Sequence, residues 1–351
     1  MTNKTRYFVV VSLLVLGVGF GTGLVAYYVG FPAGAAASRG GPAELGFIPR
    51  DASVIAFANV HDIMTSELRQ KLRRAIPVQE NGQQELQNQT GINLETDIDT
   101  VVACMSPEVS TSNPPGTGMV LARGRFDETK IEALMREHGA HVEDYSGKRL
   151  IVADVKDLHG DATGDLAAPR HSGSFSLAFI EPGLAAIGST KLIKSAIDLH
   201  KAGNNPQAGL ESVTGNDELM NLVKSLNASN AWAVGHFDAL RTQTHLPANV
   251  LSQIPAIQWF ALSAQVDGGL RGTIRADTRD DESANNLRDV VRGFLALAKL
   301  GSGAKPELTA MMQSLELSGT GKTVSLSFDV PAQVFDMVGA AAGDHRKPAI
   351  Q

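Results

Sequence analysis

A glycine-rich stretch near the C-terminus has the residue types of a phosphate-binding loop. Residues 318–323 include Gly-Thr-Gly-Lys-Thr, and in a phosphate loop such backbone amides, lysine and hydroxyl groups cradle the phosphates. The full motif requires a glycine where Glu316 stands, and the loop must lead into a helix whose amides face the anion. Here the alternation of Val324, Leu326 and Phe328 predicts a strand. We therefore interpret the stretch as a hairpin turn.

Two histidines have side chains that bind metals. His138 and His141 are three residues apart, but Gly139 is predicted to end the helix between them, which removes the shared helix face. A zinc site also needs a third ligand and supporting hydrogen bonds. The polar loop that follows contains further donors, namely His159, Asp161 and His171. Scattered surface histidines are the commoner case, and we assign no metal site and no cofactor.

Four aspartates resemble paired carboxylates for acid–base catalysis: Asp62, Asp127, Asp238 and Asp281. Each stands at the start of a predicted helix, where a carboxylate accepts hydrogen bonds from free backbone amides. Helix capping explains all four without catalysis. A Gly-x-Ser-x-Gly elbow, which positions the nucleophile of many serine hydrolases, does not occur in the sequence. We therefore assign no catalytic residue and expect a protein that is not an enzyme.

Cys104 is the single cysteine of the chain, and it lies in the apolar run 101–105. A chain with one cysteine forms no internal disulfide, so its core alone must hold the fold together. No partner base stands nearby in the sequence to activate the thiol. We expect Cys104 to be a small buried apolar side chain.

The segment from Tyr7 to Phe31 contains no charged side chain and is mostly apolar. A helix of about 20 apolar residues crosses the hydrocarbon core of a membrane, and its backbone groups are all satisfied internally. Lys4 and Arg6 precede the segment, and Tyr27 and Tyr28 lie near its far end, where interfacial aromatic residues collect. Residues 1–31 are predicted to form a cytoplasmic stub and a single transmembrane anchor, with the lipid bilayer as a partner.

A cleaved signal peptide is the alternative for this segment, with Ala35, Ala36 and Ala37 as a processing site. The apolar run is longer than the roughly 7–15 residues of a signal peptide, which favours an uncleaved anchor. The positive-inside rule then places the N-terminus in the cytoplasm and the rest of the chain outside the inner or plasma membrane.

The extracytoplasmic part is acidic. Removing Lys4 and Arg6 leaves 29 basic and 37 acidic residues, a net charge of about −8. Nucleic acids and anionic lipid surfaces repel such a chain. We therefore expect no nucleic-acid partner.

Composition and hairpin signals divide the remaining chain. Residues 32–44 are rich in glycine, alanine and serine and are predicted to be a flexible linker. Residues 45–200 and 217–342 each show the order strand–helix, hairpin–helix, hairpin–helix, with a linker at 201–216 and a disordered tail at 343–351. The predicted fold class is α+β: an N-terminal transmembrane helix, then two repeated units of antiparallel sheet with helices on one face.

Matching polar residues support the repeat. Arg125 and Asp127 lie between a strand and a helix in the first unit, and Arg279 and Asp281 lie at the same step of the second. The first unit has the longer loops, where insertions are tolerated. The two units are expected to pack as a pseudo-two-fold pair, and one continuous sheet shared by both is an open alternative.

Three short motifs resemble exported bacterial protein families of unknown function. They are Phe-Ile-Pro-Arg-Asp-Ala at 47–52, Gly-Ile-Asn-Leu at 91–94 before Asp-Ile-Asp at 97–99, and the strand–Gly–Arg–Phe–Asp–helix passage at 121–131. The resemblance implies an envelope-facing α+β protein and carries no known activity.

Three functional hypotheses follow. The first is a non-enzymatic, membrane-tethered envelope protein that binds a partner through its sheet surface or loops. The second is a carrier or sensor of an apolar small ligand, and the third is an enzyme of unrecognised type. A deep pocket with convergent polar groups would favour the enzyme.

Overall fold

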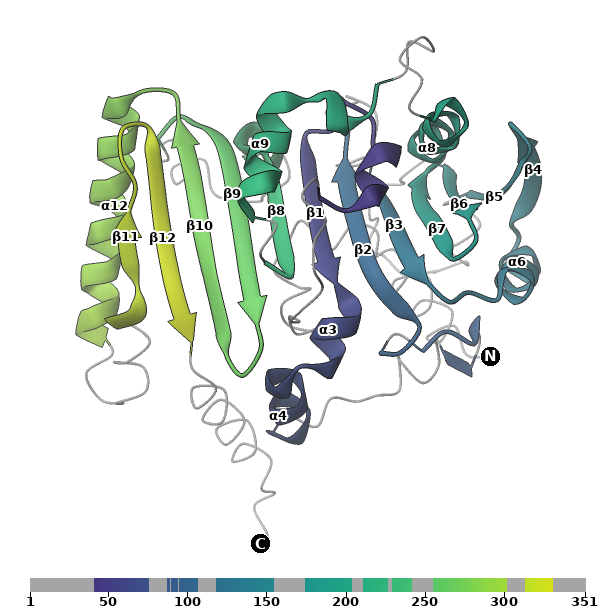
Figure 1. Cartoon of the computed structure of the whole chain (residues 1–351), viewed down its shortest axis with the longest axis horizontal. Helices are drawn as coiled ribbons and strands as arrows, with labels where there is room; N and C mark the ends of the chain where they lie inside the picture. The colour runs from purple at the N-terminus through teal and green to yellow at the C-terminus, as the bar shows by residue number, and fades with distance from the viewer. Residues whose placement is uncertain are drawn as a thin grey trace, which may run out of the picture.

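A single β-sheet organises the chain (Figure 1). In this computed structural model, the described residues are 41–75, 87–88, 90–93, 95–106, 118–154, 174–203, 211–226, 229–241, 255–301 and 313–330. All the strands among them belong to one twelve-stranded sheet, and every neighbouring pair is antiparallel. The predicted α+β class is therefore wrong, because the described part is mostly one sheet with few helices.

The elements have the following bounds. The strands are β1 (Val54–Asn59), β2 (Ile98–Met105), β3 (Gly118–Gly124), β4 (His141–Tyr145), β5 (Lys148–Asp154), β6 (Ser174–Glu181), β7 (Leu184–Ser189), β8 (Ala231–His236), β9 (Ile257–Val266), β10 (Leu270–Thr278), β11 (Glu316–Ser318) and β12 (Thr323–Val330). The α-helices are α3 (Val60–Thr65), α4 (Glu67–Ala75), α6 (Glu128–Glu137), α8 (Thr190–Ala202), α9 (Asp217–Leu226), α10 (Phe237–Arg241) and α12 (Asp281–Gly301). Two 3₁₀ helices are η2 (Ala43–Phe47) and η4 (Val213–Gly215).

The two halves of the chain meet in the central pair β1 and β8. Ala56 lies opposite Ala233, and the backbone N–H of Asn59 donates to the carbonyl of Asn230 at 2.9 Å. From this pair the strands run outward as β1-β2-β3-β7-β6-β5-β4 on one side and β8-β9-β10-β12-β11 on the other. Hydrogen bonding is continuous across the pair, so two separate sheet units do not form. The domain limits at 45–200 and 217–342 stay predictions.

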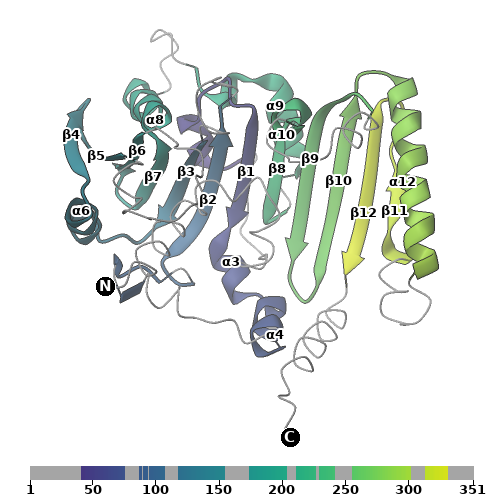
Figure 2. The same ribbon diagram turned by 180° about the vertical axis from the view of Figure 1, so that it is seen from behind.

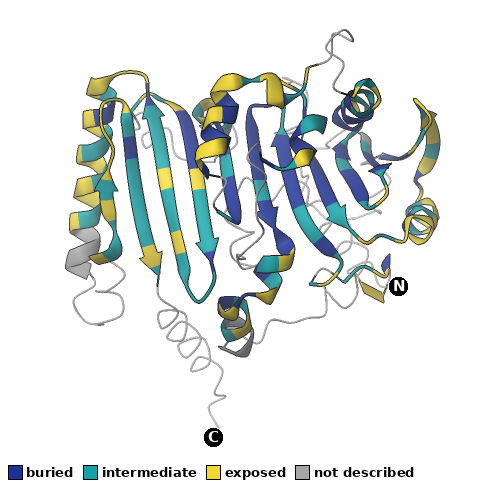
Figure 3. Ribbon diagram, viewed as in Figure 1, coloured by how far each residue is buried: buried dark blue, intermediate teal, exposed yellow. Residues whose placement is uncertain are grey.

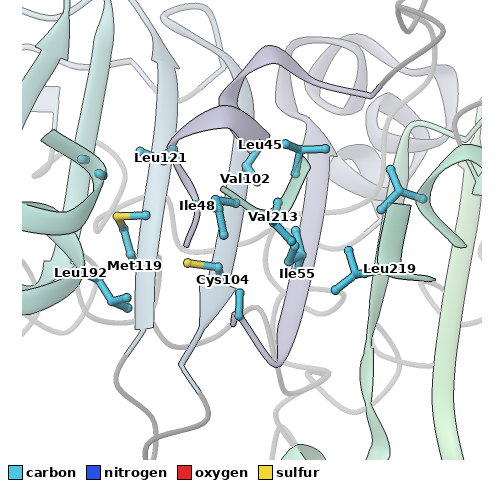
Figure 4. Close-up of a cluster of buried hydrophobic side chains, with 14 of the residues drawn as sticks. Leu45, Ile48, Ile55, Val102, Cys104, Met119, Leu121, Leu192, Val213 and Leu219 are labelled. Atoms are coloured by element: carbon cyan, nitrogen blue, oxygen red, sulfur yellow. The ribbon is translucent and has the colours of Figure 1, made fainter. Parts of the chain in front are cut away.

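The main core lies on the front face of the sheet, which is toward the viewer in Figure 1. There η2, η4, α8 and α9 cover strands from both halves. Leu45 and Ile48 extend from η2 and the residue that ends it, and both pack in this core with 0% exposure (Figure 4). Figure 3 shows the burial concentrated in β1–β3 and β5–β7, whereas β10 and β12 are mostly intermediate.

Helices also cover the back face, so the prediction of helices on one face is wrong. Successive strand residues point to opposite faces, and Leu150 belongs to the front core while Ile151 packs with Ile131 of α6 behind the sheet. Ile63 of α3 packs with Ala58 in the same way. Seen from behind, α12 runs along the β11 edge of the sheet (Figure 2), and it contacts β10, β11 and β12.

The first predicted helix is divided into two. A single helix is expected to begin at Asp62, but α3 ends at Thr65 and a second helix, α4, begins at Glu67. Between them Ser66 has extended backbone angles, and its hydroxyl accepts a hydrogen bond from the Arg69 amide at 3.1 Å. A serine that caps the next helix competes with continuation of the previous one.

The predicted membrane span from Tyr7 to Phe31 lies outside the described residues, as does the tail at 343–351. Within the described part, no helix has both the length and the apolar composition needed to span a membrane. Linker 32–44 ends earlier than expected, because η2 begins at Ala43 and its Glu44 is buried.

Candidate functional site

The Gly-Thr-Gly-Lys-Thr stretch is the turn between β11 and β12, as predicted. Gly319 and Gly321 have φ of +100° and +54°, which glycine adopts without steric cost. The Arg288 side chain donates hydrogen bonds to the carbonyls of Gly321 and Thr323 at 2.7 and 2.9 Å. The turn therefore presents carbonyl oxygens to a cation and leads into a strand, which is the opposite of a phosphate loop.

His138 and His141 do not share a face. His138 ends α6, with Nδ1 3.0 Å from the carbonyl oxygen of Leu134. His141 starts β4, and its Nε2 lies 3.2 Å from Oε1 of Glu143. Gly139, with φ of +91°, turns the chain between them as the sequence predicts. The described residues contain no group of three metal-binding side chains, and His159, Asp161 and His171 lie outside them.

A shallow hollow of about 530 Å³ lies beside His141, lined by Arg136, Ala140, His141, Val142, Glu143, Asp144 and Arg149. Its charged side chains have ionic partners, some of which lie outside the lining. Arg149 donates to Glu132 at 2.8 Å, and this hydrogen bond lowers the pKa of the Glu132 carboxyl. The hollow is an open surface of neutralised ion pairs, and it lacks the apolar walls that most ligand pockets have.

Only one of the four predicted aspartate caps is confirmed. The Lys130 amide donates to Oδ1 of Asp127 at 3.0 Å, so Asp127 caps α6. At α12 the cap is Asp280, which accepts from the Ser283 amide at 2.7 Å, and Asp281 is the first helical residue.

The other two predicted caps lie inside their helices. Asn59 caps α3 through the amide of Asp62, at 3.2 Å. Asp62 itself lies in the first turn of α3, where burial raises the pKa of its carboxyl. Asp238 lies in the first turn of α10. The sequence prediction was off by one to three residues because several neighbouring polar residues are able to cap.

Cys104 is buried as expected, with 3% of its surface exposed. It lies opposite Met119 on the front face of β2, within the main core. Burial raises the pKa of the thiol to about 12, so the nucleophilic thiolate is scarcely populated at neutral pH.

Glu44, Arg123, Glu181 and His200 form a partly buried ion-pair cluster that no sequence pattern predicts. The Arg123 Nε donates to Glu44, whose side chain is 7% exposed. Glu181 lies between Arg123 and His200, at 3.4 Å from each. The cluster connects η2 to β3, the β6–β7 hairpin and the end of α8. It therefore holds η2, which precedes the first strand, against the sheet. Its members are far apart in sequence, and no local pattern brings them together.

The back face carries one apolar row across all twelve strands. In register order the row is Val142, Ile151, Leu177, Ile187, Val120, Ala103, Ala56, Ala233, Leu262, Ile274, Leu326 and Leu317. Only Leu262 and Ile274 in this row are exposed, at 38% and 45%. They lie on β9 and β10, between the part of the sheet covered by α3 and the part covered by α12.

Helix α12 adds two more exposed apolar side chains beside these strands. Arg288 bonds to the β11–β12 turn, and Val290 lies two residues further on, which is about 200° around the helix. Val290 and Phe294 are four residues apart, so they lie one above the other. They therefore face away from that turn, toward β10, with 43% and 68% exposed.

We call Leu262, Ile274, Val290 and Phe294 the open surface. The back-face residues around it on β9, β10 and β12 carry no charge: Phe260, Ala264, Val266, Leu270, Gly272, Ala276, Val324, Leu326, Phe328 and Val330. The front face of β10 and β12 is polar, since Arg275 lies opposite Ser325 and Asp277 lies opposite Thr323. In the sequence, the only sign of this surface is on the helix at 283–300. Its apolar residues spread over a wider arc of the helix than one stripe packed against a sheet would need.

Comparisons with known proteins add no family to this description. No protein-family model, no curated protein and no solved structure matches the chain. The resemblance of its short motifs to exported bacterial families therefore stays a prediction.

Proposed function

We propose that this chain is a membrane-tethered binding protein of the bacterial envelope, which performs no catalysis and docks a protein partner through the open surface. The observation that carries the proposal is a group of four apolar side chains, each at least 38% exposed: Leu262 and Ile274 on an uncharged part of the sheet, and Val290 and Phe294 on α12, which contacts β10. Contiguous apolar patches of a few hundred Å² on soluble domains commonly mark interaction sites.

The size of the patch supports a macromolecular partner. Taking roughly 100–200 Å² for each side chain when fully exposed, the four exposed fractions correspond to about 300 Å². Leaving this area in water costs several kcal/mol at about 25 cal/mol per Å², which docking would recover. An apolar small ligand requires a concave apolar site, whereas the hollow beside His141 is lined by charged groups.

The sequence supports the tether and the compartment. The uncharged segment from Tyr7 to Phe31 has the length of a membrane span, and Lys4 and Arg6 favour a cytoplasmic N-terminus. The net charge of about −8 beyond these two residues disfavours nucleic acid as the partner.

Two measurements test the proposal. Full-length protein should stay with membranes after a carbonate wash, and its C-terminus should be accessible from outside the cytoplasm. A soluble product, or a mature N-terminus near Ser38, would contradict the tether.

The binding surface is tested by a photo-crosslinking amino acid placed at Ile274 of the full-length chain in its native membrane. The matched control is Thr273, the next residue, which points to the opposite face of the same strand. Position 274 should capture a protein partner that position 273 does not. Equal capture at both positions, or none, would contradict a role for the open surface.

A further inference from the structure

We infer that the occupant of the open surface is a second copy of this chain, held in a two-fold dimer. The inference rests on the proposed function, since it identifies the partner of that surface.

The exposed apolar area is compatible with a dimer interface to which both subunits contribute the open surface. A standard stable interface buries about 1,600 Å², of which about 56% is apolar, so it needs roughly 900 Å² of apolar surface. One copy of the open surface offers about 300 Å². In a two-fold dimer the same patch is buried on both subunits, so the total is about 600 Å², two thirds of the requirement. With a partner that contributed no apolar surface of its own, the total would stay at one third.

The open surface of one copy is complementary in shape to the open surface of a second copy. Phe294 is the most exposed large apolar side chain among the described residues, at 68%, and it extends from the flank of α12. Ile274 and Leu262 form a floor two strands wide, about 10 Å at the usual strand spacing. In a two-fold arrangement Phe294 of each copy lies on the floor of the other. Aromatic anchors seated in such apolar recesses dominate the binding free energy of many interfaces.

The open surface lacks charge on its strands, so two identical copies can make contact there without repulsion between like charges. The outer part of each chain carries a net charge of about −8, so two copies repel each other at most of their surfaces. The back-face side chains of β9, β10 and β12 are all uncharged, so contact between these strands places no carboxylates opposite each other. On α12, the exposed Asp289 beside Val290 is paired with Arg292 at 3.0 Å. The tether assists further, because confinement to one membrane raises the effective concentration of the two copies. We therefore expect a dimer that is well populated in the membrane and weak in dilute detergent solution.

Crosslinking through introduced cysteines tests the dimer directly. The only native cysteine, Cys104, is buried with a pKa raised to about 12, so a maleimide crosslinker leaves it unmodified. Full-length Phe294→Cys and Ile274→Cys chains, carrying tags of different size, are co-reconstituted in lipid vesicles and treated with a short bis-maleimide. The matched control replaces Ile274→Cys by Thr273→Cys on the opposite face of β10.

The 294–274 combination should give a mixed-tag dimer in at least roughly tenfold excess over the 294–273 combination, because only the first pair lies within the interface. Without crosslinker, Phe294→Gln should weaken self-association of the full-length chain by roughly tenfold or more while its thermal melting curve stays unchanged. Equal crosslinking of the two combinations, or self-association unaffected by Phe294→Gln, would overturn the inference.

The outcomes also separate this inference from the proposed function. If the photo-crosslinker at Ile274 captures a different protein in native membranes and the two tagged chains do not crosslink, the dimer is wrong and the binding function stands. If position 274 captures nothing and the tagged chains do not crosslink, both proposals fail.

Discussion

Leu262 of β9 and Ile274 of β10 lie directly opposite each other on the back face of the sheet, and both are more than one-third exposed. Their row continues through Ala233 and Ala56 at the centre to Ile151 near the far edge, where the same kind of side chain is 1% exposed. An aliphatic pair left open in an otherwise covered row is the structural basis of the proposed binding surface.

Ile151 and Ile274 form a natural comparison along this row. Ile151→Ala removes methyl groups from a packed site and should lower the free energy of unfolding by about 3 kcal/mol. Ile274→Ala should cost about 1 kcal/mol or less, because the side chain is 45% exposed. Urea unfolding followed by circular dichroism, at concentrations too low for self-association, measures both. Equal costs would mean that Ile274 is covered within the single chain.

Asp127 and Asp281 were predicted to play the same role, and the structure separates them. Asp127→Ala should lower the free energy of unfolding by about 1 kcal/mol, because the Lys130 amide loses its acceptor, and Asp127→Asn should restore most of it. Asp281→Ala keeps the Asp280 cap of α12 and should have a much smaller effect. A larger loss for Asp281→Ala than for Asp127→Ala, in the same urea titration, would reverse this assignment.

Turns and helix caps depend mainly on neighbouring residues, so the sequence is informative about them. The turn at Gly321 connects two strands as predicted, and the turns at Gly183 and Gly268 have the same kind of residue that favours tight turns. Ser189 caps α8 through the Leu192 amide at 3.4 Å, as a serine before a helix commonly does. In these cases the residues that specify the conformation are within a few positions of those that adopt it.

Non-local features were not predicted, since they depend on how strands are ordered in the sheet. The pairing of β1 with β8 joins both halves into one sheet, and hairpin patterns do not specify it. Which face of the sheet a helix covers depends on the path of the loops that connect it to the strands. The periodicity of apolar residues does not predict that path. For the same reason the contact of Arg123 with Glu44, 79 residues away, and the openness of Ile274 had no signal in the sequence.

Cys104 provides a probe of global unfolding. Its thiol is 3% exposed and burial raises its pKa to about 12, so the folded chain should react with a disulfide reagent at pH 8 only as fast as it unfolds. Adding urea to above the unfolding midpoint should expose one fast-reacting thiol per chain. The Ile274→Cys variant, whose new thiol is on the surface, should react at once in the folded state. Fast reaction of the folded wild-type chain would show that the core around β2 opens locally.

Asp97 should make stability depend on pH in the acid range. Its carboxylate accepts a hydrogen bond from the Asn93 amide at 2.9 Å and pairs with Arg125, and these contacts lower its pKa from the ordinary 3.8. A lowered folded-state pKa means that the stabilisation is fully present above the unfolded-state pKa and is lost as the pH falls through the folded-state value. Asp97→Asn should therefore be less stable than wild type at pH 7, and the two unfolding curves should converge below about pH 4. A difference that stays constant across this range would exclude the ionised carboxylate as its source.

The Arg123–Glu44 pair should be the most sensitive ionic contact in the described part of the chain, because Glu44 is only 7% exposed. Arg123→Met leaves a buried carboxylate without its main partner and should cost roughly 3 kcal/mol of unfolding free energy. Adding Glu44→Gln to that variant removes the buried charge and should recover part of the loss, which a double-mutant cycle measures as coupling. The control is Arg50→Met, which breaks the exposed pair of Arg50 with Glu211 and should cost less than about 1 kcal/mol. If the two arginine variants lose the same stability, or the second substitution recovers nothing, burial does not strengthen this contact. A large loss with recovery would instead establish that the pair locks η2, the first described helix after the predicted tether, onto the sheet.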